Sequence, residues 1–269
     1  MKSLLQTLLA IFVLIGMSSL MPVVSYGADP TFEEILDQAT HGNADAQYKL
    51  GDMYKYGEGT PANDKESFKW YTEAAKLYRD LAEQGDADAQ YLLGDMYRFG
   101  EGVAQDIDEG VKWYRKAAEQ GHLRALYLLG WMYQHGGSRV VKDDREAVKW
   151  YRKAAAQGHS EAQYMLGWMY QNGKGIVQDL KEAATWFRKA AEQGHTQAQF
   201  NLGWMYDQGE GVLQDYVTAY AWYNLAASQK HDGAKYNRDF ILAKMIPDQI
   251  ETAQKLSRVL YDKIYKQTN

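Results

Sequence analysis

Apolar residues recur along the chain with the spacing of amphipathic helices, and they do so in a unit that repeats. Within residues 158–193, Ala162, Leu166, Met169 and Tyr170 stand at positions i, i+4, i+7 and i+8, which is one stripe of a helix. Each unit also carries a second stripe, which predicts a pair of helices that we call helix A and helix B. The period is about 36 residues when the units are aligned on the glycine that precedes each one: Gly42, Gly85, Gly121, Gly158 and Gly194.

Glycines and acidic residues mark where the two helices begin and end. Gly173 and Gly175 predict the end of helix A, because glycine adopts the left-handed conformation of helix C-termini without steric cost. Asp179, followed three residues later by Glu182, has the spacing of a capping box and predicts the start of helix B. The same spacing recurs in other units, at Asn63, Asp106 and Asp143.

Small residues inside the predicted helices indicate close helix packing. A glycine in the middle of a helix costs about 1 kcal/mol relative to alanine, so its recurrence at one position predicts that a neighbouring helix approaches there. The mid-helix glycines of helix A are Gly51, Gly94, Gly130, Gly167 and Gly203. Alanines recur in helix B and suggest the same, at Ala74, Ala117, Ala154, Ala190 and Ala226.

The complete pattern is Ala-x-x-x-Leu-Gly-x-Met-Tyr-x-x-Gly-x-Gly, then Asp, then Ala-x-x-Trp-Tyr/Phe-x-x-Ala-Ala-x-Gln-Gly. It resembles the Sel-one-like repeat, a relative of the tetratricopeptide repeat. The resemblance covers residues 42–230 and implies an all-α, right-handed α/α solenoid of about five two-helix repeats. The expected repeats are 42–84, 85–120, 121–157, 158–193 and 194–230.

Two repeats depart from the pattern. The first carries seven extra residues near 72–78, which lengthen helix B by about 10 Å. Because seven residues make almost two full turns, the buried face of the helix stays within about 20° of its direction before the insertion. The third has Gly136-Gly137-Ser138-Arg139 in place of the Gly-x-Gly turn, with one extra residue.

Both ends of the array are predicted to form caps. Residues 28–41 contain a capping box, Thr31 to Glu34, that opens a single half-repeat helix. Residues 231–269 hold a degenerate helix followed by a final helix, for which Pro247 fits the first position. Because terminal units of a solenoid face solvent, we expect polar outer faces on these caps.

The first 27 residues read as a secretory signal peptide. Lys2 gives a positive start, residues 4–16 are apolar, and Ser25-Tyr26-Gly27 is a small-x-small cleavage site that predicts a cut after Gly27. The alternative is an uncleaved membrane anchor, although the apolar run is shorter than the roughly 20 residues of a membrane span. The sequence therefore predicts a periplasmic or secreted protein.

The net charge and the lack of cysteine exclude some partners and some chemistry. Without Lys2 the chain carries 29 basic and 35 acidic side chains, which is a formal charge of −6. This sign argues against nucleic acid and anionic lipid as partners. The chain has no cysteine, so disulfides and thiol chemistry are absent. Cysteine-rich members of the resembled family have been proposed to bind or hydrolyse β-lactams, and their paired cysteines are missing here.

No motif predicts an enzyme. The sequence lacks Gly-x-Ser-x-Gly, His-Glu-x-x-His, Ser-x-x-Lys and both phosphate-binding glycine patterns. His122, His159 and His195 each follow a boundary glycine and would stand about 10 Å apart, too far for one metal ion. We interpret them as polar residues at the start of helix A, with a pH-sensitive edge as the alternative. We expect no catalytic residue, no metal and no cofactor.

Aromatic residues on the other side of helix A are the better candidates for a binding site. On a helical wheel with Ala162 at zero, Tyr164 and Trp168 fall at about 200° and 240°, away from the apolar stripe. The resemblance implies that the A helices line a concave groove. This groove would be acidic in the N-terminal half of the repeat array and aromatic in the C-terminal half. The candidate groove residues are Tyr127, Trp131, Tyr164, Trp168, Phe200 and Trp204, with Asp52 and Asp95.

Two alternatives stay open for the tryptophans of helix A, which could contact a partner in the groove or be buried between successive A helices. The tryptophans of helix B align with its alanine stripe and are predicted to lie in the core. The helix B tryptophans are Trp70, Trp113, Trp150, Trp186 and Trp222.

The sequence thus favours a scaffold that binds a protein or peptide partner in the groove. We expect this partner to have a basic end and an apolar end. The alternative function is cell-wall binding, in which the aromatic rings stack on peptidoglycan sugars, or weak hydrolysis of the cell wall. The identity of the partner and the oligomeric state are not predicted.

Overall fold

The computed structural model describes residues 30–136 and 139–266, and in these ranges it contains helices and no strand. The predicted signal peptide lies outside the described residues, as does part of the altered turn of the third repeat. Helix A of the five repeats is α3 (Ala44–Tyr56), α5 (Ala87–Phe99), α7 (Leu123–His135), α9 (Ser160–Asn172) and α11 (Thr196–Gln208). Helix B is α4 (Asp64–Glu83), α6 (Ile107–Glu119), α8 (Asp144–Ala156), α10 (Leu180–Ala191) and α12 (Tyr216–Ser228).

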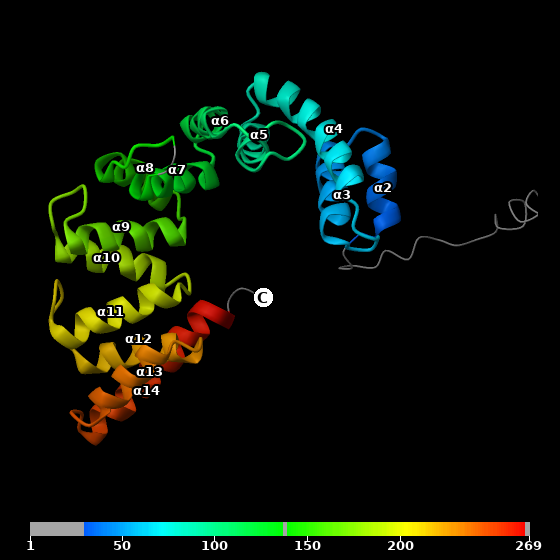
Figure 1. The fold of residues 1–269 in the computed structure, drawn as a ribbon. Helices are drawn as coiled ribbons and strands as arrows, with labels where there is room; N and C mark the ends of the chain where they lie inside the picture. Colours follow the sequence, from blue (N-terminus) through cyan, green and yellow to red (C-terminus); the bar gives the residue numbers. More distant parts are fainter. Residues whose placement is uncertain (1–29, 137–138, 267–269) are drawn as a thin grey trace, which may run out of the picture.

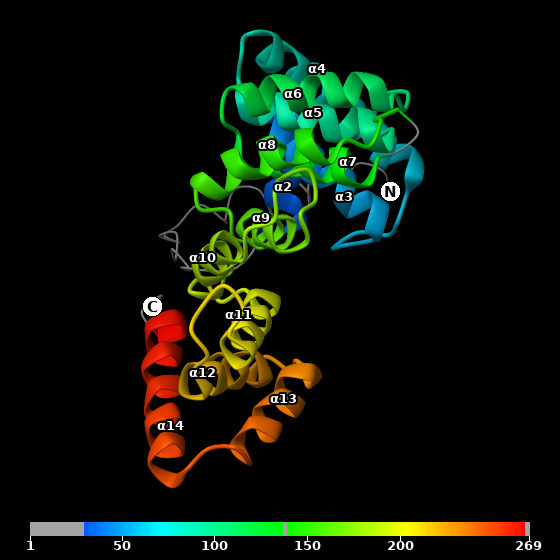
Figure 2. The ribbon, with the colours of Figure 1, turned by 90° about the vertical axis from the view of Figure 1, so that its left-hand side faces the viewer.

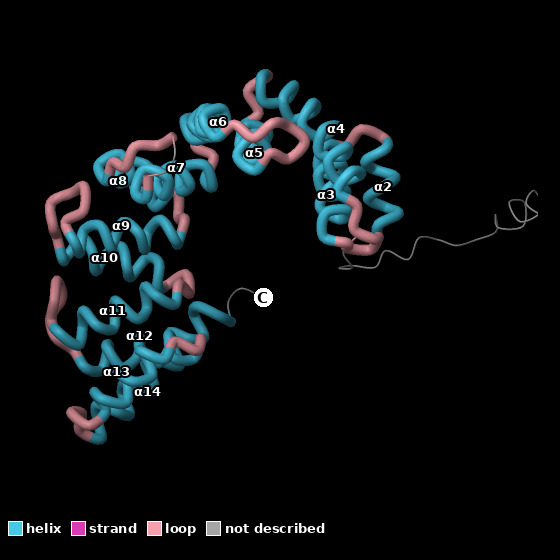
Figure 3. The backbone as a smooth tube through the Cα atoms, viewed as in Figure 1, coloured by secondary structure: helices cyan, strands magenta, loops and turns pink. Residues whose placement is uncertain are grey.

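Three more helices close the ends of the array. Helix α2 (Phe32–Thr40) precedes the first repeat, and α13 (Asp232–Leu242) and α14 (Pro247–Tyr261) follow the fifth, with a short π-helical turn at Asp262–Lys266. The helices follow one another round an open arc, with α5 and α7 on its inner side and α6 and α8 on its outer side (Figure 1). Only helices and their connecting loops make up this arc (Figure 3). The predicted all-α solenoid of two-helix repeats is confirmed.

Helix A and helix B of each repeat meet at the mid-helix glycine. A methyl group added at Gly167 would lie 2.8 Å from Cδ1 of Phe187, and at Gly130 it would lie 2.6 Å from Cδ1 of Tyr151. The other three repeats place a tyrosine ring over the glycine in the same way, at Gly51, Gly94 and Gly203. The close approach predicted from the glycines is therefore confirmed, and an aromatic ring of helix B fills the space.

The second glycine of the Gly-x-Gly turn joins one repeat to the previous one. A methyl group on Gly175 would lie 2.1 Å from the carbonyl oxygen of Asp144, at the start of α8. On Gly211 it would lie 2.2 Å from the carbonyl oxygen of Leu180, at the start of α10. Both glycines also have positive φ angles, so the turn ends helix A and packs against the preceding helix B.

Side chains at the helix starts cap the backbone as predicted. The carboxylate of Asp179 accepts hydrogen bonds from the backbone N–H groups of Lys181 and Glu182. The reciprocal bond from a Glu side chain, which a capping box requires, is present at Thr31 with Glu34. At the start of α8, Glu146 instead forms an ion pair with the lysine three residues later. The caps of helix B are thus single Asp or Asn caps.

Two further sets of hydrogen bonds connect neighbouring repeats. An arginine of helix B donates to the hydroxyl of a tyrosine in the next helix A, in the pairs Arg79–Tyr97, Arg115–Tyr133, Arg152–Tyr170 and Arg188–Tyr206. In addition, Gln193 donates to Gln163, whose amide donates to the carbonyl oxygen of Ala155 in the previous repeat. The third repeat has Leu126 at the position of Gln163 and lacks this relay.

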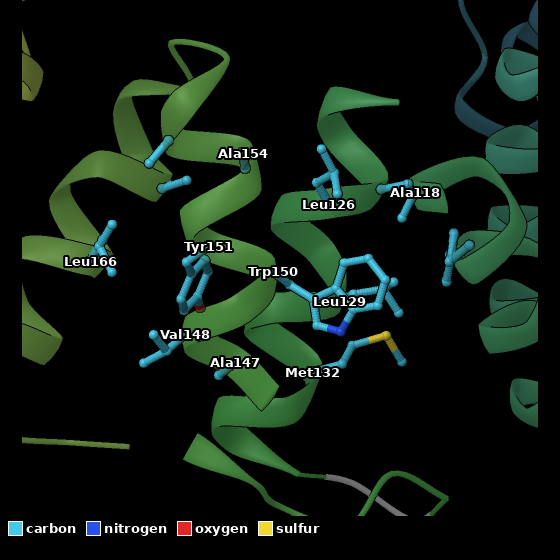
Figure 4. Packing of buried hydrophobic residues seen from close by; sticks show 14 of the residues in the cluster. Ala118, Leu126, Leu129, Met132, Ala147, Val148, Trp150, Tyr151, Ala154 and Leu166 are labelled. Carbon is cyan, nitrogen blue, oxygen red and sulfur yellow. The ribbon is translucent and has the colours of Figure 1, made fainter. Parts of the chain in front are cut away.

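The core follows the repeats from end to end. Figure 4 shows part of it, where Trp150 of α8 lies beside Leu129 and Met132 of α7, and Tyr151 lies nearer Val148. Three of the helix B tryptophans are buried, as predicted, at Trp113, Trp150 and Trp222. Trp70 and Trp186 are only partly buried, and the prediction is wrong for them. A lysine ammonium, on Lys69 or Lys189, lies over each of these two rings.

The seven extra residues of the first repeat lengthen α4 and supply a ring that packs on the tyrosine of helix A. In later repeats a histidine packs on the corresponding ring. Helix α4 has 20 residues, whereas α6 and α8 have 13 each. Tyr78, in the added stretch, packs against Tyr48 of α3 and donates a hydrogen bond of 2.6 Å to Asp45. The insertion therefore keeps the helix face and adds a buried ring.

At the C-terminal end, α13 continues the series of A helices. Lys230 stands where the other repeats have a boundary glycine and adopts a positive φ of 66°. Helix α14 then turns back from the end of α13 (Figure 2) and packs against α12. There Leu260 and Ile264 pack against the core that contains Trp222 and Leu225, and Ala253 of α14 shares a core with Ile241 of α13. Among the described helices, none combines the length and apolarity of a membrane span.

The glycine contact gives a direct test of this packing. We expect Gly167→Ala to lower the free energy of unfolding by about 1 to 2 kcal/mol, because overpacking against the buried ring of Phe187 exceeds the gain in helix propensity. The matched control is Gly233→Ala in α13, where the closest atom to the new methyl group is 3.3 Å away in the ring of His231. Denaturant unfolding would compare the two, and equal stability of both variants would contradict the packing argument.

Candidate binding surface

The glycine contact also fixes which residues of helix A point away from helix B. Gly167 faces α10 and Leu166 packs in the core of α7 and α8, so positions of α9 turned away from both contacts form the inner surface of the repeat. In α9 these positions, spaced three or four residues apart, are Glu161, Met165, Trp168 and Asn172. The third of them is the residue directly after the glycine, and it is tryptophan in three successive repeats.

These three tryptophans each keep part of their surface open. Trp131 is 38% exposed and stacks on His135, with 4.6 Å between the ring centroids. Trp168 and Trp204 are partly buried, because each packs against the cores of two neighbouring repeats. Both interpretations left open by the sequence thus apply in part, since each ring is held by packing and still presents an edge. We define Trp131, Trp168, Trp204 and, at the matching position of α13, Phe240 as the inner row.

The tyrosines and phenylalanine of the predicted site are partly buried and contact the next repeat. Tyr127 stacks on the ring of His159, Tyr164 on His195, and Phe200 on His231, with centroids 4.5 to 4.8 Å apart. Tyr91 makes the same contact with His122. These rings join successive repeats, and their own contact with a partner stays a prediction.

The histidines have a definite structural role, in line with their interpretation as polar residues at the start of helix A. In each of four A helices, Nδ1 of the histidine accepts the backbone N–H three residues later, at 3.1 to 3.2 Å. The Nε2–H group then faces the previous A helix, where it meets Asp88, Glu161 or Gln197. His159 is the exception, because Arg124 occupies the corresponding position.

Burial affects the protonation of these histidines. Burial lowers the pKa of His122, and the Asp88 carboxylate opposes that shift. Burial also lowers the pKa of His159, where Glu161 opposes the shift and the Arg124 cation adds to it. A protonated ring has no free Nδ1 lone pair, so protonation removes the helix cap.

The two predicted acidic residues are less available than the sequence suggests. Asp52 accepts a hydrogen bond of 2.6 Å from the hydroxyl of Tyr71, and Asp95 accepts one of 2.5 Å from Tyr114. Burial raises the pKa of both carboxyls, and the hydroxyl donors oppose this. Both aspartates are half-buried, so the more exposed carboxylates of this half are those of Asp45 and Asp88.

Sequence reasoning missed four aromatic residues that are more exposed than the predicted ones. Tyr56 is 65% exposed and Phe99 57% exposed, at the C-terminal ends of the first two A helices. Tyr236 is 72% exposed and Phe240 55% exposed, on α13. The spacing from Gln229 to Ala234 matches that of the repeats and could have identified α13 as a sixth helix A. Exposed Tyr236 and Phe240 also contradict the expected polar face of the C-terminal cap.

No metal site is found on the described residues, because no three His, Asp or Glu side chains converge as ligands. The exposed aromatic edges therefore give this surface its chemistry, which is apolar contact, ring stacking and hydrogen bonding from indole N–H groups.

A family model for the Sel1 repeat matches residues 44–78, 87–122, 123–159, 160–195 and 196–231. The chain belongs to the Sel1 repeat family, which the sequence pattern indicated under its longer name. Proteins with this fold generally serve as scaffolds for protein–protein interaction, and the family is generally not enzymatic.

Two solved structures show the similarity in detail. A Sel1 repeat protein from Oxalobacter formigenes is 35% identical with a TM-score of 0.65, and the match covers 78% of this chain and 59% of that one. A protective antigen of uropathogenic Escherichia coli with an SLR fold is 31% identical with a TM-score of 0.51, covering 88% of this chain and 57% of that one. The chain thus spans less than two thirds of either protein. No curated protein matches it.

The histidine caps predict a pH dependence of stability. Because the pKa of His159 is lower in the folded chain, its stabilising contribution is complete above about pH 6.5 and is lost as the pH falls through the folded pKa. We expect His159→Asn to lose less stability between pH 7 and pH 5 than the parent chain. Asparagine retains the cap without titrating, as Asn43 does in α3. Denaturant midpoints at both pH values test this, and equal losses would contradict it.

Proposed function

We propose that the protein binds an elongated segment of a protein or peptide along the inner surface of the arc, with the inner row as its main contact. The observation that carries this proposal is the recurrence of an accessible aromatic edge at one position of four consecutive A helices. Aromatic side chains in partly desolvated positions are the residues that dominate binding energy at protein interfaces. The general scaffold role of Sel1 repeat proteins supports the proposal.

The way the rings are held favours binding. Trp168 packs against the cores of two repeats, so its orientation is fixed before a partner arrives. A partner then pays little conformational entropy at these side chains, which is the advantage of preorganised contacts. Because each repeat presents one such edge, the binding energy would be distributed over several weak contacts along the arc.

The charges of the inner surface indicate the kind of partner. The inner surface carries the carboxylates of Asp45 and Asp88 in the first two repeats and of Glu161 in the fourth, whereas the aromatic inner row begins only in the third repeat. A partner with a basic end and an apolar end would match this order, with the basic end near α3 and α5.

Removal of two rings tests the proposed surface. We expect Trp168→Ala combined with Trp204→Ala to weaken partner binding at least 30-fold, since truncating one binding hot spot costs about 2 kcal/mol or more. The matched control is Val177→Ala with Leu213→Ala, which removes exposed apolar side chains from two turns between helices. Crosslinking in cells from a photoreactive residue at position 131 would identify the partner and allow its affinity to be measured.

Unchanged binding by the folded Trp168 and Trp204 variant would exclude the inner row. Purified peptidoglycan is the second test ligand. If peptidoglycan retains the parent chain and protein partners do not crosslink to it, the surface recognises cell-wall sugars and the proposal is wrong.

We also propose that the protein is exported to the periplasm or secreted after cleavage following Gly27. The support is the arrangement of residues 1–27, with a basic start, an apolar stretch and a small-x-small site. We expect the mature chain to begin at Ala28, and the mass of the protein purified from the cell envelope or medium measures this. A full-length mass would indicate that the segment is retained as an anchor.

A further inference from the structure

A hollow of about 480 Å³ lies between α12, the helix B of the fifth repeat, and α14, the helix that packs on it. Residues of both helices line it, among them Tyr220 and Leu225 of α12 and Arg258 and Tyr261 of α14. Pockets that hold small molecules typically enclose about 300 to 1,000 Å³, so the hollow has the size of a ligand site. It shares no residue with the inner row and is a separate feature of the molecule.

The sequence of α12 gives this hollow an apolar wall. Helix α12 carries no charged residue, and Asn224 and Leu225 stand where the preceding helix B has Arg188 and Lys189. The same Arg-Lys pair occurs in α6 and α8. Leu225 is 1% exposed, whereas Lys189 is exposed to solvent. The change from lysine to leucine thus allows α14 to pack on α12 and leaves an uncharged wall between the two helices.

The hydroxyl of Tyr220 opens into this hollow without a protein partner. Tyr220 is only 7% exposed, and its hydroxyl forms no hydrogen bond within the described residues. The hydroxyl is also not among the unpartnered polar atoms of buried and half-buried residues that are closed to solvent. Ser257, which lines the hollow as well, differs because its hydroxyl is closed off. An otherwise buried tyrosine therefore offers its hydroxyl as a hydrogen-bond donor.

Asn224 adds a second donor next to Tyr220, one helical turn along α12. Its amide oxygen accepts a hydrogen bond of 3.0 Å from the guanidinium of Arg238. The oxygen and nitrogen of this amide are thereby assigned, and the NH₂ group is left to donate. Both donors belong to residues that line the hollow.

Helix α14 and the turn after it give the hollow a net positive charge. Lys266 forms an ion pair of 2.8 Å with Asp262, so these two lining charges balance each other. Arg258 takes part in none of the ion pairs of the described residues and stays an uncompensated cation. A guanidinium group presents its N–H donors in a planar fork that suits a carboxylate or a phosphate. The hollow is therefore suited to an anion.

The charge of the lining favours a carboxylate over a phosphate. A carboxylate carries one negative charge, which the Arg258 cation balances, whereas a phosphate group carries about −1.5 to −2 at neutral pH. The additional negative charge would lie in the same hollow as the Asp262 carboxylate, with no further cation to balance it. The side chains of Leu225 and Tyr261 suit an apolar group attached to the carboxylate.

We propose that the hollow between α12 and α14 binds a carboxylate that is attached to a small apolar group. Arg258 pairs with the carboxylate, and the Tyr220 hydroxyl and the Asn224 amide donate hydrogen bonds to the ligand. Leu225 and Tyr261 contact the apolar group. Such a carboxylate belongs either to a free organic acid or to the C-terminal end of a polypeptide. The site goes beyond the proposed function, because it lies on helix B and the cap and not on the inner surface.

Matched probes test the carboxylate and its source. Phenylacetate represents a free acid and acetyl-glycyl-phenylalanine a chain end, and the corresponding amides keep these shapes without the charge. Binding to the full chain is followed by calorimetry and by the NMR signals of the Leu225 methyl groups. We expect saturable binding of at least one acid, the tighter one giving the source, and at least about tenfold weaker binding of its amide. If neither acid binds saturably, or if acid and amide bind equally, the inference is wrong.

Phenyl phosphate tests the choice between the two anions. Because the Arg258 cation balances one negative charge and Asp262 lies in the same hollow, we expect phenyl phosphate to bind more weakly than phenylacetate. Tighter binding of phenyl phosphate would overturn the assignment to a carboxylate.

Substitutions in the lining test the named roles. Arg258→Gln keeps the helix propensity of α14 and removes the cation, so we expect the affinity for the acid to fall about tenfold and that for the amide to stay the same. The matched control is Lys255→Gln, which removes a cation of the same helix that is paired with Glu251 outside the hollow. Equal affinity of these two variants for the acid would overturn the inference.

Two more variants locate the bound acid. Tyr220→Phe keeps the buried ring and removes the hydroxyl, and we expect a loss of roughly three- to tenfold, the range of one hydrogen bond. Trp131→Ala removes an exposed ring of the inner row, two repeats away, and should bind the acid as the parent chain does. A loss in Trp131→Ala as large as that in Arg258→Gln would place the acid on the inner row and contradict the proposed site.

Discussion

The contact between a mid-helix glycine and an aromatic ring determines the geometry of every repeat. With a side chain at Gly130 or Gly167, the ring of Tyr151 or Phe187 could not lie against the backbone of helix A. The contact brings the two helices close and fixes the rotation of helix A about its axis. Because successive residues of a helix differ by about 100°, the residue after the glycine then points to the inner surface. The position of the inner row therefore follows from the packing of the core.

Regular contacts between repeats turn five such pairs into a continuous surface. The second glycine of the turn packs on the preceding helix B. Arg–Tyr hydrogen bonds join each helix B to the next helix A, and histidine stacks hold successive A helices in register. The third repeat departs from this regularity, since Leu126 replaces the glutamine of the relay and Arg124 faces His159. Helix α14 ends the series by packing on α12, and Phe240 of α13 stays exposed.

Much of this could be predicted from the sequence, because the fold depends on spacings that a single chain displays. Gly167 predicted a close helix and Asp179 a helix start, and both follow from local backbone chemistry. Partial burial could not be predicted, because it depends on which neighbour covers a residue. The sequence correctly predicted that Trp168 lies on the side of helix A away from the apolar stripe. Nothing in the pattern showed that the cores of two repeats pack against its ring. The hydroxyl bonded to Asp52 likewise belongs to another helix.

The two series of tryptophans show how the rotation of a helix decides the function of a residue type. Trp150 on helix B lies in the core and its N–H group is closed off, which costs hydrogen-bonding energy but fills the space between repeats. Trp168 on helix A packs against the cores of two repeats and stays only partly buried. A buried donor without an acceptor destabilises the fold, whereas a hydrated donor costs nothing until a ligand displaces its water.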